Sequence, residues 1–231
     1  LLGLLPQTSG TVELCGQPIN DVPRLALART IQPIFQDPYS SLNPRLRAEA
    51  IVREPMDSIG TLPVDQRPAR VAELFEQVGL RPEQMKLFPH QFSGGQRQRI
   101  GIARALATNP ELIICDEAVS ALDVAVQAQI LNLLAELRRD LGLTYLFISH
   151  NLSVVRYLAN TVAIMYLGRI VEQGPVEELF NTPKHPYTKS LLNAVPDLGE
   201  RKPFEPLTGD VPSPLKPPAA CHFHPRCPIY L

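Results

Sequence analysis

The sequence predicts an α/β protein in which a helical segment interrupts the sheet domain and a proline-rich tail follows it. From Ser93 onward, short apolar runs alternate with amphipathic stretches, the order typical of strands and helices in a parallel α/β sheet. Between residues 45 and 91 the apolar spacing is helical, with no strand pattern. Beyond about Pro183 the prolines crowd together, which favours extended segments.

The composition is that of an ordinary globular protein. The 231 residues are 45% hydrophobic and 19% charged, and the formal net charge is −1. This balance gives no electrostatic reason to expect a nucleic-acid partner. No apolar run approaches the roughly 20 residues that a membrane-spanning helix needs. We therefore expect a soluble protein whose membrane role, if any, comes through a partner.

The chain begins with short elements and continues into helices. Thr11–Leu14 and Pro18–Ile19 predict a hairpin around Gly16, and a brief apolar run, Ile31–Phe35, ends in the loop signal Gln36-Asp37-Pro38. Apolar residues then recur with helical spacing up to a closing glycine: Val71, Leu74, Phe75, Val78 and Gly79. We expect a helical insertion over residues 45–92.

The α/β alternation begins after this insertion. A helix is expected from Gly95 or Gln96 to about Thr108, with Ser93 placed to cap it. A buried strand, Leu112–Cys115, comes next.

A second helix and strand complete a βαβ unit. The helix has one apolar face and ends at a glycine: Val126, Ile130, Leu133, Leu134, Leu137, Leu141 and Gly142. The second buried strand, Leu143–Ile148, ends in Ser149-His150, as the first ends in Asp116-Glu117. Consecutive parallel strands present these ends at one edge of the sheet, where open α/β sheets bind their ligands.

The remaining pattern predicts a helix near Leu152–Leu158 and then a hairpin. Its strands are Thr161–Leu167 and Arg169–Glu172, which turn at Gly168.

The acidic pair Asp116-Glu117 is suited to phosphoryl transfer. One carboxylate can lie near Mg²⁺ while the other orients or deprotonates an attacking water. The alternative is an acidic helix start, because Asp and Glu favour helix N-termini. Taken alone, the sequence Asp116-Glu117 favours an acidic helix start over a catalytic role.

The run Ser93-Gly94-Gly95-Gln96 strengthens the functional interpretation. Two glycines at a helix start expose backbone N–H groups, and the helix dipole attracts phosphate to that end. A glycine-rich loop with a serine cap is the structural alternative, and it is common in any fold.

Together these segments resemble the motifs of ABC-type ATPases. Ser93-Gly94-Gly95-Gln96 resembles the signature motif, and Leu112–Glu117 resembles the Walker B strand with its catalytic glutamate. Ser120-Ala121-Leu122-Asp123 is similar to the D-loop, His150 to the switch histidine and Gln36 to the Q-loop glutamine. The resemblance implies an ABC-type P-loop ATPase core.

The resemblance also implies a role for each residue around one nucleotide. Gln36 would contact Mg²⁺ or the lytic water, and Asp116 would support Mg²⁺, largely through water. Glu117 would polarise the attacking water, and His150 would hold the γ-phosphate of ATP. Each residue taken singly also has a structural explanation, and the order of the motifs supports the functional one.

Two further roles concern a dimer. The resemblance implies that Ser93, Gly94, Gly95 and Gln96 bind ATP held by the opposite subunit. Asp123 would bridge between the subunits. The nucleotide-binding set is therefore Gln36, Ser93–Gln96 and Asp123, in a homodimer or a heterodimer.

The phosphate-binding motif G-x-x-x-x-G-K-[ST] is absent from the 231 residues. Relatives of this kind place it just before a segment like Leu1–Ile19. We expect the sequence to be a fragment that starts just past this loop, and that this fragment alone is inactive. A naturally degenerate, non-catalytic subunit that lends Ser93–Gln96 to another chain is the alternative.

Local sequences resemble the dipeptide/oligopeptide importer subfamily. They are Gln36–Pro44, Asn181–Thr188, Leu207–Leu215 and Cys221–Pro228. The resemblance implies an ATPase that powers peptide import, peripheral at the cytoplasmic face of the membrane. Its partners would be a second ABC ATPase subunit, two membrane-spanning permease subunits and a substrate-binding protein. A soluble ABC ATPase acting on ribosomes or nucleic acid is a further alternative.

The resemblance implies a division into three parts. Residues 1–44 and 93–182 would form an N-terminally truncated RecA-like core, 45–92 a helical signature subdomain, and 183–231 a C-terminal extension. A cysteine-rich tail of this kind can hold an iron–sulfur cluster, with Cys221 and Cys227 as ligands. Such a cluster needs about four thiolates, and reduced cysteines are the alternative.

Overall fold

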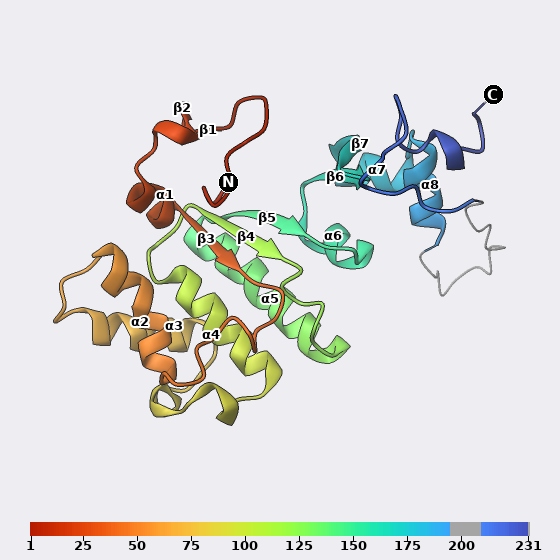
Figure 1. Ribbon diagram of the computed structural model, residues 1–231. Coiled ribbons are helices and arrows are strands. Elements are labelled where there is room, and N and C mark those ends of the chain that lie inside the picture. Colours follow the sequence, from red (N-terminus) through yellow and green to blue (C-terminus); the bar gives the residue numbers. More distant parts are fainter. Residues whose placement is uncertain (195–208, 231) are drawn as a thin grey trace. The chain divides into compact units, whose positions relative to one another are not determined.

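The computed structural model describes residues 1–194 and 209–230. The chain divides into two compact units, Leu1–His150 and Asn151–Leu231, and Figure 1 shows the elements of each. Residues 195–208 and 231 of the predicted C-terminal extension lie outside the described residues. The expected domain limits at residues 44, 92 and 182 stay predictions.

The first unit contains the predicted hairpin and a parallel sheet. Strands β1 (Glu13–Leu14) and β2 (Gln17–Pro18) pair antiparallel, which confirms the hairpin. Strands β3 (Ile31–Ile34), β4 (Leu112–Asp116) and β5 (Thr144–Ile148) form a three-stranded sheet in the order β3-β4-β5. Both pairings are parallel, so the three carboxyl ends lie at one edge.

Five helices accompany these strands in the described part of the first unit. They are α1 (Arg24–Thr30), α2 (Ala48–Ile59), α3 (Arg67–Gln77), α4 (Gly94–Leu106) and α5 (Val124–Leu141). Short 3-10 turns occupy Ile19–Asp21, Pro82–Lys86 and Pro89–Gln91. The segment expected to be helical is helical, and Figure 1 shows α2 and α3 beside α4.

The helices bury the apolar faces that the sequence pattern predicts. In α3, Leu74 and Phe75 have no exposed surface, and Val71 and the following Val78 are also buried. In α5 the buried side chains include Ile130, Leu133, Leu134 and Leu137, whereas Leu141 at the helix end is exposed. Gly142 follows in a left-handed conformation with φ 67°, as a C-cap glycine does.

The sequence prediction of a buried strand at Leu143–Ile148 is only partly right. Side chains of β5 alternate in exposure, and Leu146 and Ile148 are 41% and 48% exposed. Leu146 and Ile148 share one face of the strand with Thr144, and this face is exposed among the described residues. The apolar sequence predicted burial on both faces and could not identify the exposed one.

The described part of the second unit contains a helix, a hairpin and two more helices. Helix α6 (Leu152–Leu158) precedes β6 (Thr161–Tyr166) and β7 (Arg169–Pro175), which pair antiparallel as predicted. Helices α7 (Val176–Asn181) and α8 (Pro186–Asn193) follow, and His224–Arg226 form a 3-10 turn. The expectation of extended chain beyond Pro183 is wrong at α8, where Pro186 occupies the first helical position that tolerates it. Among the described residues, none of the helices combines the length and apolarity required to cross a bilayer.

The segment around Phe223 packs against β6 and α8 through aromatic side chains. Phe223 is fully buried, and its ring lies 5.2 Å from that of Tyr166 and 5.3 Å from that of Tyr187. The neighbouring His222 places Nδ1 3.0 Å from the carbonyl oxygen of Leu167. A single buried ring therefore anchors the segment around residue 223 within this unit.

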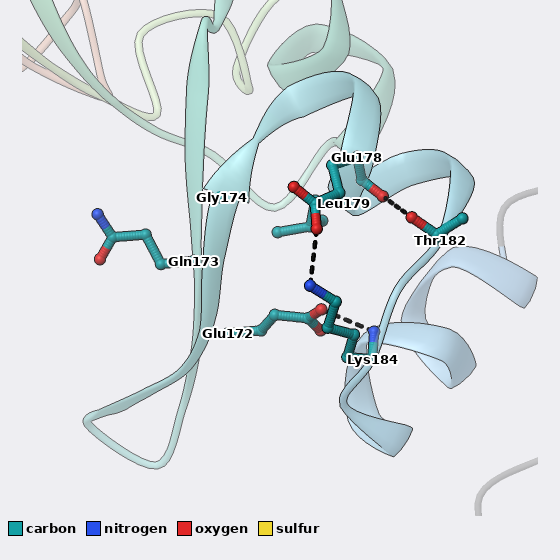
Figure 2. Close-up of a pocket in the computed structure, with 7 residues that line it drawn as sticks. All are labelled: Glu172, Gln173, Gly174, Glu178, Leu179, Thr182 and Lys184. Carbon is teal, nitrogen blue, oxygen red and sulfur yellow. Dashed lines mark hydrogen bonds and ion pairs between the residues drawn. The ribbon is translucent and has the colours of Figure 1, made fainter.

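Glu172 fixes the start of α8, beside a pocket of about 50 Å³ (Figure 2). Its carboxylate accepts hydrogen bonds from the backbone N–H groups of Lys184, at 2.7 Å, and His185, at 3.0 Å. The Lys184 ammonium in turn lies 2.7 Å from a carboxylate oxygen of Glu178. The pocket is small, and its charged lining residues are paired with one another or with the backbone, so we regard it as a structural feature where β7, α7 and the loop before α8 meet.

Candidate active site

Polar side chains that follow three neighbouring strands meet at the carboxyl edge of the sheet, where two of them contact the carboxylate of the third. Gln36 follows β3, Glu117 follows β4 and His150 follows β5. The Gln36 side-chain amide donates to Oε2 of Glu117 at 2.7 Å, and Nδ1 of His150 lies 3.1 Å from Oε1. Each oxygen of the Glu117 carboxylate therefore has one polar neighbour. The parallel register brings together residues that are 81 and 33 positions apart in the sequence.

The backbone holds Glu117 in a conformation that L-residues rarely adopt. Its φ is 46°, in the left-handed region. Its N–H donates to the carbonyl of Ile148 at 3.0 Å, which continues the pairing of β4 with β5. Its carbonyl accepts from both the N–H and the hydroxyl of Ser120, each at 3.0 Å. These contacts on both sides of the residue fix the direction of its side chain, which is 27% exposed.

Asp116 ends β4 immediately before Glu117. It pairs in register with Ile148, and its side chain is exposed at the carboxyl edge of the sheet. An exposed carboxylate at this position can contribute to a Mg²⁺ site that is completed by phosphate oxygens and water.

The residues of the signature-like run cap a helix. Ser93 and Gln96 form a capping box: the Gln96 N–H donates to Oγ of Ser93 at 3.3 Å, and the Ser93 N–H donates to Oε1 of Gln96 at 3.0 Å. The run therefore lies at the N-terminus of α4, as predicted. Its predicted contact with nucleotide stays a prediction.

Gly95 has a packing role that the sequence did not reveal. A Cβ at this position would lie 2.5 Å from Cγ1 of Val126, so α4 and α5 approach too closely for any larger residue. At Gly94 the nearest atom to such a Cβ would be Cδ2 of Leu122, at 3.5 Å, an ordinary contact.

Asp123 caps α5. Its Oδ1 accepts a hydrogen bond from the N–H of Val126 at 3.0 Å. The predicted bridging between subunits stays a prediction, beside this structural role within the chain.

Gln98 is a polar residue near the site that sequence reasoning missed. It is 1% exposed, and its side-chain amide donates to the carbonyl of Ala118 at 2.6 Å. It lies four residues before Ile102 and seven before Ala105, both fully buried. This helical spacing was the available signal, because it places a glutamine on the buried face of α4.

The loop after β3 is ordered by polar contacts of its own. Hydrogen bonds from the Tyr39 N–H, at 2.8 Å, and from Ser40 hold the pKa of the Asp37 carboxyl below its ordinary value. Arg104 of α4 donates from Nη1 to the carbonyl of Ser41 at 2.6 Å, and burial lowers the pKa of its guanidinium. The loop that begins at Gln36 is therefore attached to α4.

The cysteines are all free thiols in the described residues. Burial raises the pKa of Cys115, within β4, to about 12. Cys221 is exposed and Cys227 is half-buried. Within residues 1–194 and 209–230 no group of three or more His, Cys, Asp or Glu residues could hold a metal ion. The described residues therefore do not supply the ligand set of an iron–sulfur cluster.

Two family profiles match the chain. The ABC transporter family matches residues 1–120, and the oligopeptide/dipeptide transporter C-terminal region matches residues 171–230. A Brucella abortus (strain 2308) protein named as a peptide import ATP-binding protein is 52% identical over 99% of this chain and 70% of its own length. The oligopeptide transport ATP-binding protein AppF of Bacillus subtilis (strain 168) is 47% identical over 99% of this chain and 72% of its own length.

A solved structure has the same fold. It is cbiO1 from Clostridium perfringens, part of the ABC transporter complex cbiONQ, with a TM-score of 0.69 and 27% sequence identity. The similarity covers 78% of this chain and 72% of that structure. The fold is thus the α/β fold of an ABC ATPase, as predicted. The chain belongs to the family of ABC transporter ATP-binding proteins, of the type that carries the oligopeptide/dipeptide transporter C-terminal region.

Proposed function

We propose that this chain is part of an ATP-hydrolysing subunit that powers peptide import, with Glu117 as its catalytic carboxylate. The observation that supports this most strongly is the meeting of Gln36, Glu117 and His150 at the carboxyl edge of the sheet. Membership of the ABC transporter family and relatives named for peptide transport give the reaction and the type of cargo.

In this proposal Glu117 orients the water that attacks the γ-phosphate and accepts its proton. An ionised carboxylate only accepts hydrogen bonds, so the contact with His150 requires a proton on Nδ1. A water that replaces the Gln36 or His150 side chain would hydrogen-bond to a carboxylate whose direction the backbone contacts have already fixed. That preorganisation lowers the barrier because little reorientation is needed during the reaction.

Asp116 and Gln36 are the residues that would hold Mg²⁺. Mg²⁺ uses one or two carboxylates together with substrate phosphates, so an exposed Asp116 fits this need without a larger protein ligand set. Mg²⁺ bound with ATP supplies positive charge that neutralises the phosphate oxygens.

The proposed assembly has the ATPase at the cytoplasmic face of a membrane. Ser93–Gln96 would contact ATP held by a second ABC subunit, across a dimer in which Asp123 bridges the two chains. Two permease subunits and a substrate-binding protein would complete the importer. The cbiO1 structure, as part of a cbiONQ complex, supports a place within a larger transporter.

The test is steady-state ATP hydrolysis by the full-length gene product, with its membrane partners present, beside the Glu117→Gln variant. We expect the variant to lose about 100-fold or more in kcat, because it keeps the shape of Glu117 and lacks a basic carboxylate. Turnover that survives in Glu117→Gln would exclude Glu117 as the catalytic group.

Failure of the parent to hydrolyse ATP would favour the non-catalytic alternative. A subunit of that kind would still lend Ser93–Gln96 to a partner chain. Binding of ATP to the partner chain, measured with and without this chain, then separates such a subunit from an inert protein. Co-purification with ribosomes in place of membrane subunits would instead overturn the transport proposal.

A further inference from the structure

The amide of Gln98 makes a buried contact between α4 and the residue that follows Glu117. Gln98 is 1% exposed, and its Nε2 donates to the carbonyl oxygen of Ala118 at 2.6 Å. Ala118 itself is 1% exposed. A buried amide costs free energy unless it is hydrogen-bonded, so this contact holds both partners in a defined geometry.

The carbonyl that Gln98 binds belongs to a strained part of the backbone. Glu117 has a left-handed φ of 46°. Its own N–H and carbonyl are fixed by Ile148 and Ser120, and the next carbonyl along the chain is fixed by Gln98. A non-glycine residue persists in this conformation only where its surroundings impose it. Among these contacts, the one from Gln98 comes from α4.

We propose that Gln98 is a positioning residue for Glu117: its amide holds the Ala118 carbonyl, and thereby keeps the Glu117 carboxylate between Gln36 and His150. The inference rests on the proposed catalytic role of Glu117. Gln98 lies on α4, the helix that begins at Ser93–Gln96. The helix proposed to contact ATP held by a partner subunit therefore also positions the Glu117 carboxylate of this subunit's own site.

The decisive comparison is between Gln98→Met and Thr108→Val in the full-length protein with its membrane partners. Methionine keeps the length of glutamine and removes the donor. Thr108 is also 1% exposed and donates to a backbone carbonyl, that of Arg29 at 3.3 Å, but it lies beyond the other end of α4. Both variants therefore lose one hydrogen bond donated by a buried side chain, and only one of those bonds reaches the loop after Glu117.

We expect Gln98→Met to lower kcat about 10- to 100-fold while KM for ATP changes less than about 2-fold, because a misplaced carboxylate impairs the chemical step. Thr108→Val should keep kcat within about 2-fold of the parent. Equal losses of kcat in the two variants would overturn the proposal.

A third variant, Gln98→Glu, restores the hydrogen-bond donor to the Ala118 carbonyl only when its carboxyl is protonated. Gln98→Glu has the same length, and burial favours the protonated carboxyl, which can donate to the Ala118 carbonyl. Its turnover relative to the parent should rise as the pH falls, whereas the ratio for Gln98→Met should stay constant. A ratio for Gln98→Glu that does not change with pH would also count against the positioning role.

Hydrogen exchange separates this inference from the proposed function. The amides of Glu117 and Ser120 flank Ala118, and each donates to a backbone carbonyl. In Gln98→Met they should exchange at least about 10-fold faster, with no such change in Thr108→Val. Unchanged exchange at both amides would overturn the inference even if ATP is hydrolysed. If the parent protein lacks ATP turnover, faster exchange in Gln98→Met than in the parent would support the positioning contact while the proposed function fails.

Discussion

Glu117 shows how single residues prepare the site. A left-handed conformation costs a non-glycine residue roughly 1–2 kcal/mol, and the hydrogen bonds to Ile148 and Ser120 offset that cost. The result is a carboxylate whose direction is set before any ligand arrives. Gln36 and His150 then satisfy its two oxygens from neighbouring strand ends.

Ser93 allows a residue-scale prediction that separates capping from nucleotide contact. Ser93→Ala should lower the free energy of unfolding by about 1 kcal/mol, because the N-cap acceptor for the Gln96 N–H is lost. Ser93→Asp should restore that stability, since aspartate caps equally well. Its negative charge at the proposed phosphate contact should nevertheless keep ATP hydrolysis at least about 10-fold low. Chemical unfolding and steady-state ATPase assays measure the two effects, and full turnover in Ser93→Asp would leave Ser93 as a cap only.

At the scale of elements, α4 contacts two of the loops that carry the site. Its N-terminus presents Ser93–Gln96, Gln98 binds the loop after β4, and Arg104 binds the loop after β3. Its close approach to α5 depends on Gly95. Helix α4 thus connects the signature-like run to the loops that follow β3 and β4.

The approach of α4 to α5 gives a packing prediction. Gly95→Ala should cost about 1–3 kcal/mol of stability, because the new methyl group would lie 2.5 Å from the Val126 side chain. A second substitution, Val126→Ala, should recover most of that loss in a double-mutant cycle. The matched control is Gly101→Ala in the same helix, where a Cβ meets nothing within 4 Å. It should stabilise the protein by about 0.5–1 kcal/mol, and a Gly95→Ala variant as stable as this control would contradict the packing argument.

The Glu172 clamp at the start of α8 gives a prediction of pH dependence. Burial alone would raise the pKa of Glu172, but hydrogen-bond donors around it, including the Lys184 and His185 N–H groups, hold the pKa below its ordinary value. A carboxyl with a depressed pKa stabilises the fold above its unfolded-state pKa of 4.5 and loses that contribution as the pH falls through the folded value. Near pH 7, Glu172→Gln should lower the melting temperature by about 2–4 °C, the shift that accompanies ~1 kcal/mol in a chain of this size.

The difference in melting temperature between parent and Glu172→Gln should shrink as the pH is lowered towards 3.5. Thermal unfolding of both proteins across this range measures it. Glu177→Gln is a suitable control, because the side chain of Glu177 is exposed at the start of α7. A difference that is constant with pH would exclude the titration of Glu172 as its cause.

At the scale of the whole molecule, the proposed division of the ATP site between subunits predicts nucleotide-dependent dimers. Full-length Glu117→Gln should bind ATP without hydrolysing it and so accumulate as a closed dimer, which light scattering during size-exclusion chromatography would detect. Adding Ser93→Arg to the same chain should abolish the dimer, because a bulky cation blocks the start of α4. A Glu117→Gln protein that stays monomeric at saturating ATP would exclude a homodimer.

Much of the fold could be predicted from the sequence because local patterns determined it. The period of the apolar residues identified α3 and α5, and the glycines at 79 and 142 marked their ends. Runs of apolar residues ending in polar ones identified β4 and β5 and placed Asp116, Glu117 and His150 at a common edge. These features depend on neighbours within a few residues, so no knowledge of the tertiary fold was needed.

Other features depended on contacts between distant segments. The exposure of Leu146 and Ile148 depends on whether another element packs on their face of β5, which an apolar run does not reveal. The helix α8 forms where proline-rich sequence predicted extended chain, because Glu172 binds the N–H groups at its start. Both outcomes depend on segments outside the local sequence.

The sequence by itself determined the fold class, the family resemblance and the identity of the residues proposed for the site, because these lie in local motifs whose order is diagnostic. The tertiary structure alone decided that both oxygens of Glu117 are engaged, that Gln98 holds the backbone beside it, and that Gly95 is required by Val126. The physical reason is that hydrogen bonds and steric contacts act over a few ångströms. Only folding brings Gln36 and His150 within that distance of Glu117, and Gln98 within that distance of Ala118.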